Sequence, residues 1–280
     1  MKYIPVFYDK HMDAPVAQSS PSAQKPGKVV TAWLKAKLPI DVFSPTPPAQ
    51  IDLRLAHSRT MVNDIMNGKA PNGFGTSSVE VARTFPWTVG AMVNAAFAAN
   101  RIGVACAPVS GFHHARWDEP GGFCTFNGLV VAARRFHNTR GGNVAILDCD
   151  QHYGNGTVDI IDHLKLDFIR HFTVGGDPRF GRPDRADAFL TRLPEWIAAF
   201  VREGCKLLIY QAGADPHIKD PLGGWLTTAQ LHQRDRIVFE TCRKEGLPVA
   251  WNLAGGYQKP FSKVIEIHMN TMKACAEVFT

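Results

Sequence analysis

Paired cysteines, long apolar runs and concentrated basic segments are all missing from this chain of 280 residues. Its six cysteines are scattered and form no CxxC pair, a usage typical of reduced thiols and not of a disulfide framework. No apolar run approaches the roughly 18 residues of a membrane span, and no basic segment followed by an apolar run opens the chain. We therefore expect a cytoplasmic protein without a signal peptide or a membrane partner.

Positive charge is present, but it is not gathered in one place. The formal net charge is +6, with lysines and arginines spread along the chain. A nucleic-acid contact needs such residues clustered on one surface. We therefore expect no nucleic acid as the main partner, and the sequence leaves the oligomeric state open.

Short apolar runs alternate with helical segments over most of the chain. Eight of the nineteen prolines fall in the first fifty residues, so this part is expected to be mostly extended and loop-like, apart from a short helix at 28–37. Apolar residues between 53 and 66 predict a helix closed by Gly68. The predicted strands are 102–107, 143–148, 168–174, 206–211 and 248–253. The remaining predicted helices are 88–100, 127–138, 157–164, 186–202, 228–245 and 262–278.

This alternation predicts an α/β fold of three layers, in which a largely parallel sheet is covered by helices on both faces. No internal repeat or low-complexity tract interrupts it, so a single domain over residues 1–280 is the simplest account. In such folds the ligand crevice lies beyond the carboxyl ends of the strands. Reactive side chains follow four predicted strands, and they are Asp148, Asp150, His152, Asp215, Tyr257, His113 and His114.

Asp150, His152 and Asp215 carry the donor atoms of a divalent metal site. Two carboxylates and one imidazole suit Zn²⁺, with Fe²⁺ or Co²⁺ as alternatives, and three protein ligands leave positions open as in catalytic sites. Because two anionic ligands offset most of the metal's charge, a bound water should be acidified less than on an all-histidine site. Such a site needs a separate general base.

The pair His113 and His114 can supply this base, since histidine accepts and returns a proton near neutral pH. Each ring needs a partner that fixes its tautomer. Asp148 and Asn155 flank the predicted metal ligands and are candidates for that role.

Tyr257 follows two glycines, Gly255 and Gly256, which allow a close backbone approach and an unusual angle of the tyrosine. Its hydroxyl can donate a hydrogen bond to the oxyanion of a tetrahedral intermediate. Metal, water, base and oxyanion donor are together the parts of metal-assisted amide hydrolysis.

Four segments resemble, in the same order, those of the histone deacetylase and acetylpolyamine amidohydrolase superfamily, which shares its fold with arginase. They are GFHHARWDEPGGFCTFN (111–127), LDCDQHYGNG (147–156), QAGADPHIKDPLGG (211–224) and LAGGY (253–257). PNGFG (71–75) and SPSAQKP (20–26) are similar to segments of bacterial members. The resemblance covers nearly the whole chain and implies the arginase/deacetylase fold. It also implies a zinc-dependent deacetylase acting on acetyl-lysine, an acetylpolyamine or a small N-acyl metabolite.

The resemblance also implies roles for the residues already named. Those that would bind zinc are Asp150, His152 and Asp215, and those that would act in catalysis are His113, His114 and Tyr257. Asp148 would pair with His113, and Asn155 with His114. The family often has Asp in place of Asn155, and because Asn carries no negative charge, the imidazolium form of His114 should be less favoured.

Further positions are implied by the resemblance alone. A potassium ion would be bound through Asp148 and Thr173. An apolar tube for the acyl-bearing chain would be lined by substrate-binding residues, which are Gly122, Phe123, Phe180 as a second aromatic wall, Gly255 and Gly256. The chain is short for the family, so the loops at the rim are expected to be reduced, and the substrate class is the least determined feature.

Two other functions stay open. A manganese ureohydrolase on the same fold needs a further Asp two residues beyond Asp215, where this chain has His217. A non-catalytic binding module on the same fold would have no need of Tyr257 and both histidines, which are present here.

Overall fold

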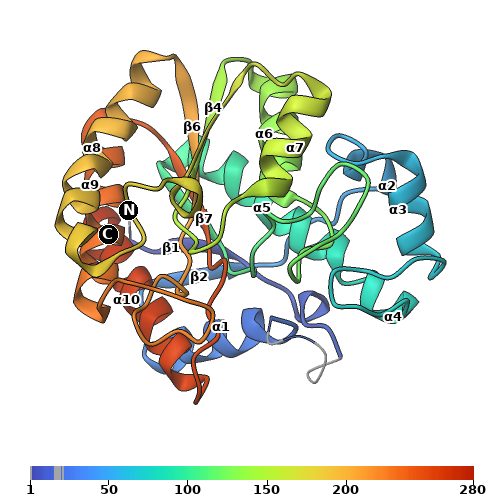
Figure 1. Cartoon of the computed structure of the whole chain (residues 1–280), viewed down its shortest axis with the longest axis horizontal. Coiled ribbons are helices and arrows are strands. Elements are labelled where there is room, and N and C mark those ends of the chain that lie inside the picture. The colour runs from blue at the N-terminus through green and yellow to red at the C-terminus, as the bar shows by residue number, and fades with distance from the viewer. Residues whose placement is uncertain (1, 16–19, 21) are drawn as a thin grey trace.

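A seven-stranded sheet in the order β2-β1-β3-β7-β6-β4-β5 forms the centre of the protein (Figure 1). The computed structural model describes residues 2–15, 20 and 22–280. All pairings between these strands are parallel, so each connection must cross back over a face of the sheet. The strands are β1 (Ile4–Phe7), β2 (Ile40–Phe43), β3 (Val104–Ala107), β4 (Asn143–Asp148), β5 (Ile169–Thr173), β6 (Cys205–Gln211) and β7 (Val249–Asn252).

Helices cover both faces of this sheet, which confirms the predicted three-layer α/β fold (Figure 1). One layer contains α1 (Lys25–Lys35), α8 (Ala186–Arg202), α9 (Thr228–Glu245) and α10 (Ser262–Phe279). The other contains α5 (Phe85–Ile102), α6 (Gly128–Arg140) and α7 (Asn155–Leu164), and α2 (Gln50–Leu53), α3 (Arg59–Met66) and α4 (Val79–Ala82) lie beyond α5. Among the described residues, no helix is both long and apolar enough to span a membrane.

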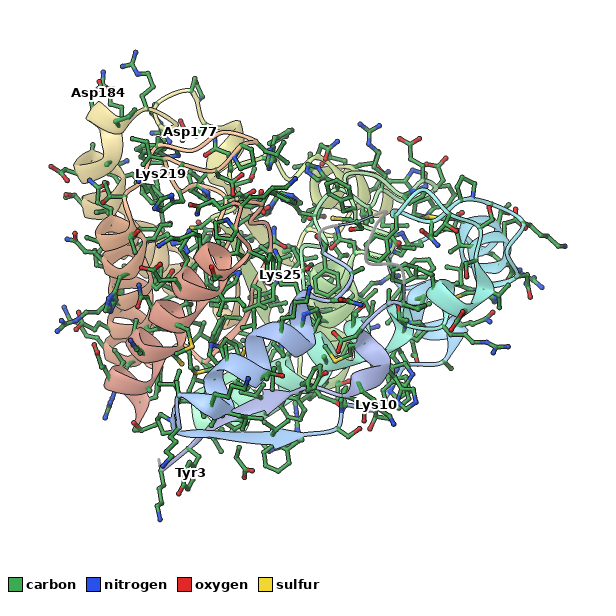
Figure 2. All side chains as sticks on the ribbon, turned by 90° about the horizontal axis from the view of Figure 1, so that it is seen from below. Tyr3, Lys10, Lys25, Asp177, Asp184 and Lys219 are labelled. Carbon is green, nitrogen blue, oxygen red and sulfur yellow. The ribbon has the colours of Figure 1, made fainter. Side chains whose placement is uncertain are left out.

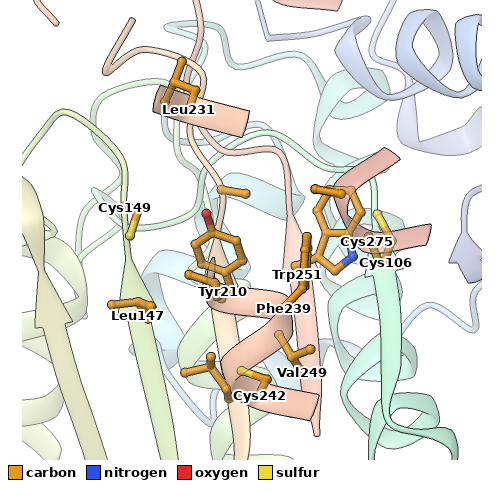
Figure 3. Close-up of a cluster of buried hydrophobic side chains, with 14 of the residues drawn as sticks. Cys106, Leu147, Cys149, Tyr210, Leu231, Phe239, Cys242, Val249, Trp251 and Cys275 are labelled. Carbon is orange, nitrogen blue, oxygen red and sulfur yellow. The ribbon is translucent and has the colours of Figure 1, made fainter. Parts of the chain in front are cut away.

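Two buried clusters, one on each face, hold the layers together. Strand residues such as Leu147, Tyr210 and Trp251 pack toward α9 and α10, against side chains that include Phe239 (Figure 3). Their neighbours along the strands, such as Ile146, pack toward α5 and α6. Because side chains alternate between two buried faces, the strands are apolar without interruption, as the sequence shows for β4.

The expectation of a mostly extended and loop-like first fifty residues with one short helix missed two strands. Strands β1 and β2 lie in this region and pair with each other, and β1 also pairs with β3. Each has only four residues, too few for a periodic pattern to stand out among the prolines. Pro26 lies in the first turn of α1, where a missing N–H is tolerated, so it starts the helix earlier than predicted.

The single helix predicted between 53 and 66 is also wrong, because the structure has two helices there, α2 and α3. The second is capped by Ser58, whose side chain accepts a hydrogen bond from the N–H of Met61 at 3.1 Å. A serine at this position satisfies one of the free N–H groups of a new helix start. The later elements agree with prediction apart from shifts of a few residues at their ends.

Polar residues occupy the carboxyl ends of four neighbouring strands. Thr173 on β5, Asp148 on β4, Gln211 on β6 and Asn252 on β7 are matched in register across the sheet. Residues matched in this way point to the same face, so the sheet presents a polar row at the edge where the ligand crevice is expected.

Candidate metal centre and active site

Asp150, His152 and Asp215 come together beyond the ends of β4 and β6. One ligand atom from each lies within 4.8 Å of the others. The His152 Nδ1 lies between the two carboxylates, 3.1 Å from Asp150 Oδ1 and 3.0 Å from Asp215 Oδ2. Both carboxylates are buried, so they need positive charge close by to remain ionised together.

The pKa values of the three groups reflect this crowding. Burial and the charge of Asp150 raise the pKa of Asp215 to about 7. Burial favours the neutral form of Asp150, but His113 and His152 outweigh it and lower the pKa of that carboxyl. Hydrogen bonds to the two carboxylates raise the pKa of His152 to about 10. The site thus attracts a cation strongly, and its donor set of two oxygens and one nitrogen fits a divalent metal.

Gly255 allows the loop after β7 to approach these ligands closely. Its N–H donates a hydrogen bond to Asp150 Oδ2 at 2.9 Å. A Cβ at this position would lie 2.6 Å from Asp215 Cγ, so any side chain would push the ligand away. A Cβ on Gly256 would lie 2.9 Å from Ala214 Cβ and Val264 Cγ1. The structure thus places Gly255 against the carboxylates of Asp150 and Asp215 and Gly256 against Ala214 and Val264; that these glycines contact substrate stays a prediction.

His113 is held by the polar row at the ends of the strands. Its Nδ1 lies 2.7 Å from Asp148 Oδ2, and its Nε2 lies 3.6 Å from Asp150 Oδ1. The other oxygen of Asp148 accepts hydrogen bonds from Gln211 Nε2 at 2.8 Å and from the N–H of Asp150 at 3.1 Å. Burial alone would lower the pKa of His113, but Asp148 and Asp150 raise it to about 9. His113 therefore favours its cationic form.

His114 has the opposite tendency, although the two rings are only 4.0 Å apart between centroids. Its Nδ1 lies 2.7 Å from Asn155 Oδ1, a carbonyl oxygen that can only accept. The proton is therefore on Nδ1, and Nε2 carries the lone pair. Burial and the charge of His113 lower the pKa of His114, which favours the neutral form. A Cβ on Gly122 would lie 2.2 Å from the His114 ring, so this loop needs a glycine.

Tyr257 faces the same centre from the loop after β7. Its ring centroid lies 6.5 Å from that of His152 and 5.9 Å from that of Phe123. Its N–H donates a hydrogen bond to Asp220 Oδ2 at 2.8 Å, which ties the loop to the segment after β6. Burial and the charges of the two ligand carboxylates raise the pKa of Tyr257, so its hydroxyl remains a donor near neutral pH.

Sequence reasoning missed Lys25, which lies in the interior at the start of α1 (Figure 2). Its Nζ donates a hydrogen bond to the carbonyl of Ala254 at 2.7 Å and lies 5.7 Å from the centroid of the Tyr257 ring. Burial lowers the pKa of Lys25 to about 8, while the nearby carboxylates oppose that shift. The only signal was its place in the SPSAQKP segment, whose Pro21 lies outside the described residues.

Phe180 and Thr173 had roles implied only by the resemblance; the structure corrects the role of Phe180, and that of Thr173 stays a prediction. Phe180 is 8% exposed and packs against Phe189 and Trp196 at ring distances of 5.6 and 5.5 Å. It is a core residue, so the prediction that it forms a wall of the substrate tube is corrected. Thr173 lies beside Asp148 in the sheet, and its Oγ1 accepts the N–H of Gly154 at 3.1 Å.

The sequence matches the family model of the histone deacetylase domain at residues 21–167 and 171–272. The chain belongs to the histone deacetylase family. An uncharacterized protein of Picosynechococcus is 30% identical over 86% of this chain and 87% of its own length. Histone deacetylase 2 of Arabidopsis thaliana is 28% identical over 80% of this chain and 65% of its own length. Acetylpolyamine amidohydrolase 1 of Pseudomonas aeruginosa is 36% identical over 52% and 48% of the two chains.

Solved structures of the family share the fold. An acetylpolyamine aminohydrolase from Burkholderia pseudomallei has a TM-score of 0.74 and 17% identity, and covers 98% of this chain and 99% of its own. The HD domain of HDA15 has a TM-score of 0.76 and 20% identity, and covers 98% and 90% of the two chains. The predicted superfamily is thus confirmed, and the protein is a hydrolase of amide bonds from a metal-dependent family.

Proposed function

We propose that this histone deacetylase-family protein is a zinc-dependent deacetylase that removes an acyl group, most simply acetyl, from an amine. The observation that carries the proposal is the meeting of Asp150, His152 and Asp215 within 4.8 Å, next to a pair of histidines of opposite protonation preference. Zinc is the first metal to test, and iron and cobalt are the alternatives because they bind to the same donor atoms.

Water adds to the carbonyl carbon, the C–N bond breaks, and the products are a carboxylate and a protonated amine. A divalent metal held by the three ligands would polarise the carbonyl and lower the pKa of a water molecule. His114 takes a proton from the attacking water through Nε2, since Asn155 holds the proton of Nδ1. Tyr257 donates its hydroxyl proton in a hydrogen bond to the oxyanion. The cation of His113 stabilises the developing negative charge, and His114 returns the proton that it took from water to the nitrogen of the departing amine as the C–N bond breaks.

The substrate class proposed is an N-acyl amine, such as acetyl-lysine, an acetylpolyamine or a small metabolite. Support comes from relatives named as histone deacetylases and as acetylpolyamine amidohydrolases. Gly122 and Phe123 are the proposed channel residues, because one packs on His114 and the other on Tyr257. Phe123 is half-buried, with a positive φ of 64° that fixes its ring beside the catalytic tyrosine. Asp148 and Thr173 are kept as the proposed potassium ligands.

His217 argues against a dinuclear ureohydrolase. Its Nε2 bonds Thr228 Oγ1 at 2.9 Å, and its Nδ1 accepts the N–H of Lys219 at 3.1 Å. Both ring nitrogens are thus engaged, one with the first residue of α9 and the other within the loop of His217 itself, whereas a second metal would need one of them. Asn155 holds His114 with its proton on Nδ1 and a free lone pair on Nε2. Proton transfer requires this arrangement, whereas binding of a substrate does not, so it argues against a non-catalytic binding module.

We also propose that residues 1–280 act as one catalytic unit in the cytoplasm, without a nucleic-acid partner. All six cysteines are free thiols in buried positions, which suits a reducing compartment.

The test is acetate release by the zinc-loaded protein from three groups of compounds: N-acetyl-lysine peptides, acetylpolyamines and acylated small amines. We expect release from at least one group, and release about 100- to 1000-fold slower from the Tyr257→Phe variant at the same metal content. A protein that binds zinc yet cleaves no member of the panel contradicts the proposal.

A further inference from the structure

Arg234 is fully buried in α9, and the proposed chemistry does not use it. Its Nη1 donates hydrogen bonds to two carbonyl oxygens, that of Gly213 at 2.8 Å and that of Cys149 at 3.2 Å. Cys149 immediately precedes the metal ligand Asp150, and Gly213 lies two residues before Asp215. One guanidinium therefore joins the two loops that carry the carboxylate ligands.

The guanidinium is itself held in place by Asp235. Arg234 Nε donates to Asp235 Oδ1 at 2.8 Å, and Nη2 lies 2.8 Å from the same oxygen. Tyr210 on β6 donates its hydroxyl to Asp235 Oδ1 at 2.5 Å, and Thr271 on α10 donates to Oδ2 at 2.6 Å. Figure 3 shows Tyr210 and Cys149 on the same side of the sheet, where this network lies. The orientation of Arg234 is thus fixed from a strand and two helices.

The two ligand loops need such a link because their carboxylates repel each other. The loops also touch directly, since a Cβ on Gly213 would lie 2.9 Å from Asp150 Cα. A planar guanidinium can donate to two carbonyls at once, and its positive charge is permanent. With its charge paired to Asp235, it can hold the carbonyls of Cys149 and Gly213 at a fixed distance from each other.

We propose that Arg234 is a positioning residue of the metal site. By binding the carbonyls of Cys149 and Gly213, it holds Asp150 and Asp215 at the separation that a divalent metal requires, before the metal arrives. This inference rests on the proposed metal site. It adds that the site is preorganised by a buried arginine on α9.

Titration of the metal-free protein with Co²⁺, followed by visible absorption, tests this role without any need for turnover. Arg234→Met removes both donors and the charge, while Arg234→Lys keeps the charge. Loss of a group that orients metal ligands typically weakens metal binding about 10- to 100-fold. We expect a loss in that range for Arg234→Met with a changed Co²⁺ spectrum, and a smaller loss for Arg234→Lys.

Tyr8→Phe is the matched control, since it removes a hydrogen bond of a tyrosine to a half-buried carboxylate, that of Asp13, outside the Arg234 network. It should lower the urea midpoint while the Co²⁺ affinity and spectrum stay those of the wild type. Wild-type affinity in Arg234→Met overturns the inference, as does an equal loss in Tyr8→Phe, which would mark a general effect of destabilisation. If the wild type itself binds no Co²⁺, the proposed function fails instead.

A hydrogen-exchange measurement on the metal-free wild type keeps the inference testable if neither Arg234 variant folds. The N–H groups of Asp150 and Ala214 donate to Asp148 Oδ1 and to the carbonyl of Gly255, at 3.1 and 2.9 Å. A preorganised site protects them before metal is added. Exchange as fast as that of an open loop, with protection only after Co²⁺ is bound, overturns the inference.

Discussion

The replacement Asn155→Asp tests the assignment of His114 as the general base. Asn155 Oδ1 lies 2.7 Å from His114 Nδ1, so the variant puts a negative charge at hydrogen-bond distance from the imidazole. Two charges about 4 Å apart interact by ~4 kcal/mol at an effective dielectric constant of ~20, which corresponds to ~3 pKa units as an upper limit. His114 is partly exposed, and the new carboxylate loses hydration, so we expect a rise of roughly 1–2 units in its pKa.

The sign of the effect on activity follows from the protonation state that a base needs. Water can be deprotonated only by neutral His114, and the wild-type pKa of His114 lies below the ordinary histidine value. Raising this pKa moves the acidic limb of the kcat/KM profile up by the same ~1–2 pH units. Well below the limb, the variant should then be about 10- to 100-fold slower, with activity recovering at higher pH.

The assay is kcat/KM for deacetylation, measured between about pH 5 and pH 10 in parallel for the wild type, for Asn155→Asp and for a third protein that serves as the control. The third is Asn138→Asp, which adds the same charge at an exposed position near the C-terminal end of α6 and should leave the profile unchanged. An acidic limb that does not move in Asn155→Asp, or a shift of the basic limb alone, refutes the role of His114 as the base.

Three further outcomes follow from the same geometry. Tyr257→Phe should keep its full metal content, since the hydroxyl is not a ligand, and should lose about 100- to 1000-fold in kcat; unchanged turnover would show that the oxyanion has another donor. Asp150→Ala should fail to retain zinc in equilibrium dialysis, because it removes a ligand that also bonds the N–H of Gly255. Gly255→Ala should weaken zinc binding in the same experiment, since its Cβ would lie 2.6 Å from Asp215 Cγ. Metal affinity equal to the wild type in either variant contradicts the close packing described for this loop.

The alternation of apolar strands and helices was sufficient to predict the sheet and its two covering layers. Residues after the strands were sufficient to predict that Asp150, His152 and Asp215 lie close together, because parallel strands bring their carboxyl ends to one edge; their role as metal ligands stays a prediction. Short segments near the N-terminus escaped prediction, since four-residue strands such as β1 carry too little periodicity to be told from loops.

The supporting residues of the site could not be predicted from the sequence. Lys25 and Arg234 are charged side chains on helices, where exposed positions are the ordinary expectation. Only the packing of α1 and α9 against the sheet shows that both are buried, with their nitrogens on loop carbonyls. Phe180 failed for the opposite reason, because an aromatic residue in a loop gives no indication of whether it faces a channel or the core.

The central claim is that Asp150, His152 and Asp215 bind one catalytic metal, and a metal titration of activity tests it most directly. The chelated protein is mixed with increasing Zn²⁺, and acetate release from the best substrate of the panel is recorded at each step. Activity should rise from zero in proportion to the added zinc and level off at one equivalent per chain, while Asp150→Ala stays inactive throughout. Full activity in the chelated protein, or none with one zinc bound, would contradict the account.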